Sequence, residues 1–183
     1  EEMFYTDRNK LVYCDCAIIQ NYPDGANELT GLERIDGREV SVLGNGNYLG
    51  SYVVSDGKIT LADGVIVSDV VVGIIETFEM STIDKNYGFT NGTTLHRKKS
   101  VSGIKIGLLD SLGGEYNIDG GDKYYPILFF NSSVNLDTNV PLFTGVKDID
   151  LRTLCDEHGT IYIRQTQGLP FCLTSVTFDL ENS

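Results

Sequence analysis

Apolar and polar residues alternate along most of the chain, and this period of two is typical of β-strands. In the first half it predicts strands over residues 11–19, 39–43, 48–54, 58–61 and 65–75. In the second half it predicts strands over residues 100–109, 124–130, 140–146, 160–164 and 171–180. Helical spacing is confined to one short turn expected at 150–157. The pattern therefore predicts an all-β fold of antiparallel sandwich or barrel-like β-units with little helix.

Turn residues and one proline refine this strand assignment. Asn45 and Gly46 predict a tight hairpin, because both tolerate positive φ. The residues Asn21, Pro23, Asp24 and Gly25 predict the end of the first strand. The continuous apolar run within 65–75 predicts a strand that is buried on both faces or lies under another sheet. Pro126 places the strand at 124–130 at a sheet edge or a bulge.

A polar stretch divides the chain into two parts. Residues 81–94 are predicted to form a long loop between a first β-unit, 1–80, and a second, 95–183, and one integrated domain is the alternative. Residue 1 is Glu and no signal-peptide pattern follows it, so we expect a piece of a longer protein. The chain has no run of about 18 apolar residues, and stable membrane insertion is therefore not expected.

The charge balance narrows the expected partners. The chain carries 26 acidic and 14 basic residues, for a net charge of −12. Sequence-reading nucleic-acid surfaces need clustered Lys and Arg, and the one such cluster, at 96–99, is short and fits a solvated turn. An acidic surface would instead repel DNA and let it slide past.

Candidate chemistry is sparse. His96 and His158 lie in no recognisable motif, and no serine has a nucleophile-elbow context. We therefore expect no enzyme, no catalytic residues and no cofactor. The four cysteines show no zinc spacing and are expected to be free thiols that act as small buried apolar residues: Cys14, Cys16, Cys155 and Cys172.

Two acidic pairs and three tyrosines keep alternatives open. Calcium is conceivable at Asp119 with Asp122, or at Asp148 with Asp150, but EF-hand spacing is missing and no metal site is predicted. A receptor- or glycan-binding module would use tyrosines as a sugar-stacking platform, and the other interpretation is cross-strand pairing: Tyr116, Tyr124 and Tyr125. A wall-degrading enzyme would need a pair of carboxylates about 5–10 Å apart.

Three groups of segments occur in an order that resembles a known family. The first group is LVYCDCA (11–17), LTGLE (29–33), DGREVSVL (36–43), GNG (44–46) and SDGKITL (55–61). The second is KKSV (98–101) and LDSLG (109–113). The third and most specific is PLFTGV (141–146), GTIYIRQ (159–165) and GLPF (168–171). Together they resemble the C-terminal region of the tail nozzle, or tail tubular protein B, family of short-tailed bacteriophages.

The resemblance implies a non-enzymatic virion protein of the phage tail, made in the host cytoplasm. It implies self-association into a ring, with a hexamer expected, contact with the head–tail connector (adaptor) protein, and a channel through which DNA passes without sequence-specific binding. The matching residues have structural roles. We expect Ile161 and Ile163 to face a core and Gln165 to bond backbone at a strand end. Turns are expected at Thr144-Gly145 and at 168–170.

Overall fold

A computed structural model describes residues 9, 11–83, 88–89, 92–93, 100–118, 120–129, 140–151 and 160–181. Its strands pair antiparallel throughout, so the predicted all-β fold is confirmed. Within these residues, the one helical element whose bounds are defined is the short 3-10 helix η2 (Glu33–Ile35). Most of the helical turn expected at 150–157 lies outside the described residues.

The chain forms two compact units. Of the described residues, those up to Thr77 and the segment Thr166–Pro170 belong to the first unit. Those from Phe78 to Gln165 and from Phe171 onward belong to the second. The expected division at residues 81–94 stays a prediction.

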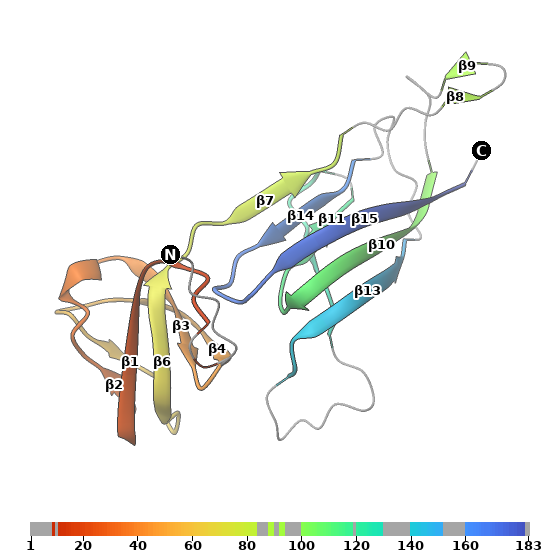
Figure 1. Ribbon diagram of the computed structural model, residues 1–183. Coiled ribbons are helices and arrows are strands. Elements are labelled where there is room, and N and C mark those ends of the chain that lie inside the picture. The colour runs from red at the N-terminus through yellow and green to blue at the C-terminus, as the bar shows by residue number, and fades with distance from the viewer. Residues whose placement is uncertain are drawn as a thin grey trace. The chain divides into compact units, whose positions relative to one another are not determined.

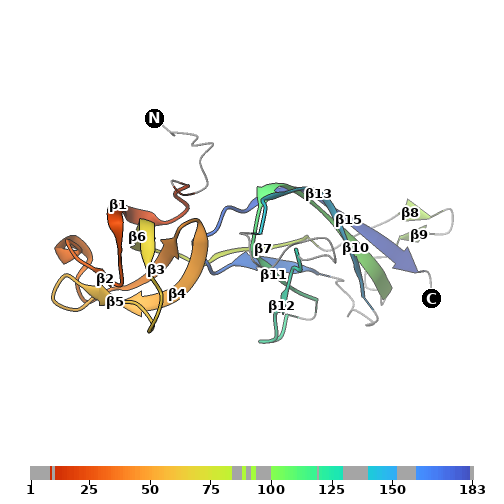
Figure 2. The ribbon, with the colours of Figure 1, turned by 90° about the horizontal axis from the view of Figure 1, so that it is seen from below.

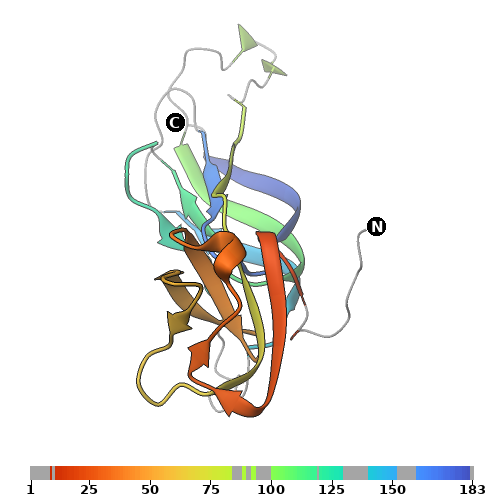
Figure 3. The same cartoon turned by 90° about the vertical axis from the view of Figure 1, so that its left-hand side faces the viewer.

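The first unit is built on a four-stranded sheet of order β1-β6-β3-β4 (Figures 1 and 3). Its strands are β1 (Asp15–Ala26), β6 (Val67–Ile74), β3 (Glu39–Gly44) and β4 (Asn47–Val53). A two-stranded ribbon of β2 (Glu28–Leu29) and β5 (Ile59–Thr60) lies beside it. The core packs one face of the sheet, from Val40, Val42, Val70 and Val72, against Leu29, Leu32 and Ile35.

The other face of this sheet is also buried. Ser41, Leu43 and Val71 point away from that core, yet they are only 0–5 % exposed. Gly168, in the segment Thr166–Pro170, donates its backbone N–H to Ser41 Oγ at 3.3 Å. We call this segment the strap, because it lies on the second face of the sheet. The predicted burial of β6 on both faces is thus confirmed at Val70–Gly73.

The β3–β4 hairpin forms at the predicted turn. Asn45 and Gly46 have φ values of 50° and 75°, as a two-residue hairpin loop requires. The Asn45 side chain also ties the turn to β6, because its Oδ1 accepts the backbone N–H groups of Ser68 and Asp69, both at 3.0 Å.

The predicted end of the first strand was wrong. The turn-forming residues 21–25 lie inside β1, which continues to Ala26. The pairing with β6 shifts between Asn21 and Ala26, and Gly25 has a φ of 76°. A bulge therefore accommodates these residues without ending the strand.

The second unit is a sandwich of two sheets (Figures 1 and 2). One sheet has the order β13-β10-β15, formed by Phe143–Asp150, Ser100–Ser111 and Cys172–Glu181. The other has the order β12-β11-β14-β7, formed by Tyr125–Pro126, Glu115–Asn117, Tyr162–Gln165 and Phe78–Ser81. The core joins the sheets through Ile104 and Ile106 on one side and Ile161 and Ile163 on the other.

Several predictions for this unit are confirmed. Ile161 and Ile163 are fully buried, and Gln165 Nε2 donates to the Leu112 carbonyl at 3.1 Å. Pro126 lies in an edge strand, β12, which Figure 2 shows beside β11, although this strand is only two residues long.

Other predictions for the unit were wrong. Thr144 and Gly145 lie within β13 and form no turn, since Gly145 with its φ of 144° fits a strand register opposite Leu108. Part of the expected loop at 81–94 forms strands, namely the end of β7 and the ribbon of β8 (Gly88–Phe89) and β9 (Gly92–Thr93). Cross-strand pairing thus reaches segments whose local composition is typical of a loop.

Candidate functional site

Three charged side chains lie in a row across the sheet β12-β11-β14-β7. The strand register pairs Arg164 on β14 with Glu79 on β7 on one side and with Glu115 on β11 on the other. Their neighbours Ile163, Met80 and Tyr116 pack into the core. Because successive residues of a strand point to opposite faces, the three charged side chains lie on the outer face. We call them the Glu–Arg–Glu row.

Tyr124 joins this row. The Arg164 guanidinium lies 3.5 Å from the centre of the Tyr124 ring, while its Nε donates to Glu115 Oε2 at 2.7 Å. The Tyr124 hydroxyl donates to Glu79 Oε2 at 2.8 Å. Burial and, next, the hydrogen bond to Glu79 raise the pKa of Tyr124. One ion-pairing residue, Glu115, and the ring of Tyr124 therefore hold the arginine in one orientation.

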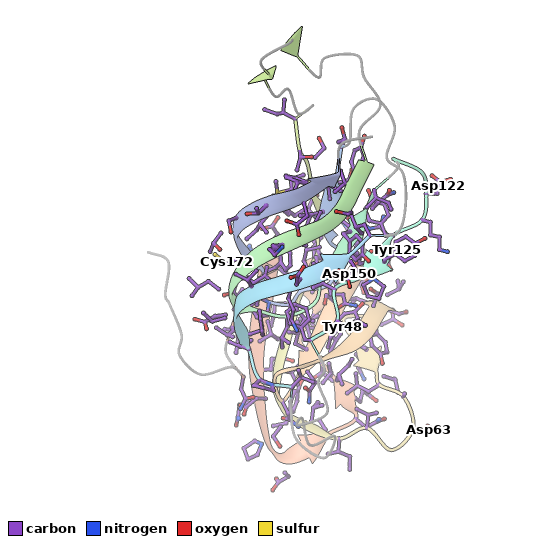
Figure 4. All side chains as sticks on the ribbon, turned by 90° about the vertical axis from the view of Figure 1, so that its right-hand side faces the viewer. Tyr48, Asp63, Asp122, Tyr125, Asp150 and Cys172 are labelled. Carbon is purple, nitrogen blue, oxygen red and sulfur yellow. The ribbon has the colours of Figure 1, made fainter. Side chains whose placement is uncertain are left out.

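A short loop brings Tyr124 to the row. Asn117 Oδ1 accepts the N–H of Gly120 at 3.1 Å, and its amide donates to the Gly121 carbonyl. The loop also approaches β14, because a Cβ added at Gly120 would lie 3.3 Å from the Tyr162 hydroxyl. Figure 4 labels Asp122 in this loop, a few residues before Tyr125. Its other predicted acidic residue, Asp119, lies outside the described residues.

The three tyrosines singled out from the sequence do not form one platform. Tyr116 and Tyr125 are directly opposite on paired strands, and their rings stack with centroids 5.7 Å apart. Lys123 lies over the Tyr125 ring, with Nζ 4.9 Å from the centroid. Burial raises the pKa of Tyr116. The cross-strand interpretation therefore holds for this pair, whereas Tyr124 belongs to the Glu–Arg–Glu row.

A second charged face lies on the sheet β13-β10-β15. Lys105 on β10 forms ion pairs with Asp179 on β15 and with Asp148 on β13, the latter at 3.8 Å. The hydrogen bond to Asp179 is the main reason that the pKa of Lys105 is raised. Asp150, labelled on β13 in Figure 4, follows Asp148 on the same face. Within the described residues no group of three or more metal-ligating side chains gathers here or elsewhere.

Three cysteines are described, and all three are free thiols. Cys14 is half-buried, and this burial raises its pKa to about 11. Cys16 and Cys172 are exposed, so the expected burial was wrong for both. Each lies on the face of its strand that is open to solvent, and so it does not pack into a core. Cys155, His96 and His158 lie outside the described residues.

Sequence reasoning missed most of the Glu–Arg–Glu row. Glu79, Glu115 and Arg164 are far apart in the sequence and occur in unrelated local patterns. The signal available was the flanking apolar alternation in 161–165, which places Arg164 opposite the core. Glu79 and Glu115 are brought to Arg164 by the register of three strands, and apolar alternation within one strand does not predict that register.

Comparison with known proteins gives no assignment, because no protein-family model and no curated protein matches the chain. The part of the chain that the structure describes also holds no helix of sufficient length and apolar character to cross a membrane.

Proposed function

We propose that this chain is a structural protein of a phage virion, part of the tail nozzle that forms the channel for DNA ejection. The observation that carries the proposal is the order of ten short segments between residues 11 and 171, which resembles the C-terminal region of the nozzle family. Each segment is short, and it is their common order and spacing that supports the assignment.

The positions of these segments in the fold agree with a structural role. Ile161 and Ile163 fill the sandwich core. Gln165, at the end of β14, donates a hydrogen bond from its side chain to a backbone carbonyl. Gly168 lies against Ser41 in the first unit. The most specific segments of the resemblance thus build the scaffold, as expected of a protein that works by assembly.

The proposal includes partners. The chain's parent protein would self-associate into a ring, a hexamer, and join the head–tail connector at the distal end of a short tail. The net charge of −12 supports passage of DNA, because a negative wall does not hold phosphates. Its place is the virion tail, after synthesis in the host cytoplasm.

The test uses the full-length parent protein with and without the connector of its virion. Particle mass and negative-stain images should show a sixfold ring that docks on the connector. A connector from an unrelated phage serves as the control and should not be bound. A monomer or trimer that ignores the cognate connector would contradict the proposal.

A further inference from the structure

We propose that the Glu–Arg–Glu row and Tyr124 form a binding site for a neutral oligosaccharide. This inference goes beyond the channel role and does not depend on it. It rests on the outer face of one sheet in the second unit, where four side chains from three strands and one loop meet.

The four side chains keep unused hydrogen-bonding groups. Arg164 hydrogen-bonds through Nε, and within the described residues its two terminal amino groups have no partner. Within the described part of the chain, Glu79 and Glu115 each accept a hydrogen bond through Oε2 and have none at Oε1. Both acids and the arginine remain partly open to solvent. The row therefore presents donors and acceptors side by side on a preorganised surface.

Folding stability accounts for only part of this arrangement, since the Arg164–Glu115 pair is half-buried while Glu79 is exposed. Exposed ion pairs contribute little to stability, because water screens them and long side chains lose rotamer freedom. Here three long side chains and a tyrosine are ordered together at the surface. Side chains that are held in one geometry but contribute little to folding stability are suited to recognition of a ligand.

The charges indicate a neutral ligand. In the strand register Arg164 lies between Glu79 and Glu115, so charges of both signs alternate along the row at the spacing of neighbouring strands. A phosphate or carboxylate on Arg164 would lie close to the two acids, and a cation on the acids would lie close to the arginine. A ligand with many hydroxyl groups avoids both costs.

Sugars match the remaining features. Neighbouring hydroxyls of a sugar can donate to a carboxylate oxygen and accept from a guanidinium N–H at the same time. The apolar face of the sugar ring can pack on a tyrosine ring. Adjacent strands lie about 4.8 Å apart, so the row spans about 10 Å. That length fits an oligosaccharide better than a single sugar.

The test measures binding of the 183-residue chain to an array of neutral oligosaccharides of glucose, galactose, mannose and N-acetylhexosamines, with hexagalacturonate as the acidic probe. We expect binding to at least one neutral probe and not to the acidic one. Arg164→Lys keeps the charge but removes the planar fork, and should weaken binding about tenfold or more. Tyr124→Ala should have a similar effect.

Matched controls separate binding from folding. Tyr48→Phe removes a tyrosine hydroxyl from the first unit, where it lies 3.2 Å from Ser51 Oγ, and should leave binding unchanged. Glu79→Gln changes an exposed side chain and should fold normally while weakening binding, which thermal melting of each variant checks. Three results would overturn the site: no binding across the array, binding only to hexagalacturonate, or binding that the row variants leave unchanged.

Discussion

Asn45 illustrates how much one side chain can organise in this protein. Its positive φ suits the hairpin between β3 and β4, and its Oδ1 accepts two backbone N–H groups at the start of β6. Its own N–H donates to the Asp69 carbonyl at 2.7 Å. One residue thus joins a turn to a strand more than twenty positions later.

Replacing Asn45 by Ala should lower the free energy of unfolding by about 1–3 kcal/mol. The substitution leaves two backbone donors without their acceptor and strains the positive φ. Urea denaturation followed by circular dichroism would measure the loss. Asn45→Asp keeps the acceptor oxygen and should cost much less. Equal losses for both variants would contradict the role given to Oδ1.

Cys14 should react with iodoacetamide more slowly than Cys16 or Cys172. The thiolate is the reactive form, and burial raises the pKa of Cys14 to about 11 while the other two thiols are exposed. Peptide mass spectrometry after timed labelling at about pH 8 would give the three rates. In denaturant the difference should vanish. Labelling of Cys14 at the rate of the exposed thiols in the folded chain would show that it is not protected.

At the scale of elements, the strap connects distant parts of the sequence. It follows β14 and precedes β15, both of the second unit, yet it belongs to the first. A Cβ added at Gly168 would lie 2.9 Å from Ser41 Oγ and 3.1 Å from Leu43 Cδ1. A side chain at this position would have to displace the ends of Ser41 and Leu43 on β3.

Gly168→Ala should therefore destabilise the protein, by about 1–3 kcal/mol, because the neighbouring side chains must shift. Chemical denaturation would measure the change. Gly103→Ala is the matched control, since the nearest atoms to its added Cβ lie at 3.4 Å, close to ordinary contact. If Gly168→Ala lowers the free energy of unfolding no more than the control does, the strap can shift to accommodate the added methyl group and the prediction is wrong.

Elements with strong local signals could be predicted from the sequence. The β3–β4 hairpin and the two-sided burial of β6 follow from residues within each element. The end of β1 could not be predicted, because a bulge absorbs the turn-forming residues and only the pairing with β6 reveals it. β11 and β7 have three and four residues, too few to show a period.

The candidate site was predictable only in part, for the same reason. Tyr124 stood out because it lies among other tyrosines beside a glycine-rich loop. Its partners Glu79 and Arg164 come from strands whose register depends on tertiary pairing. Likewise, the sequence predicts only a turn at residues 168–170. The contact between Gly168 and Ser41 joins positions 127 residues apart, so local sequence does not predict it.

At the scale of the whole molecule, folding raises the pKa of several side chains in both units. Hydrogen bonds from Lys58 to Glu28 and from Lys105 to Asp179 raise the pKa of each lysine. Burial raises the pKa of Tyr116 and Tyr124. In each case the folded chain keeps its proton to a higher pH than the unfolded chain does.

Stability should therefore fall as the pH rises past about 9, first through Cys14 and then through these lysines and tyrosines, because each titrates at a lower pH in the unfolded chain. The sign follows because the unfolded state then binds fewer protons than the folded state. Thermal melting across this range would show it. The double variant Tyr116→Phe/Tyr124→Phe should lose less stability between about pH 9 and pH 11. A midpoint that rises over this interval would contradict the prediction.

The strap also sets an order of events during synthesis. A ribosome releases the strands of the first unit well before residues 166–170 emerge, so the side of β3 that carries Ser41 and Leu43 must wait for the strap that packs on it. Nascent chains with uncovered apolar strands are prone to aggregate and to recruit chaperones. Of the two units, the first is thus the earlier to be synthesised, yet it is completed only after β14 of the second unit has been made.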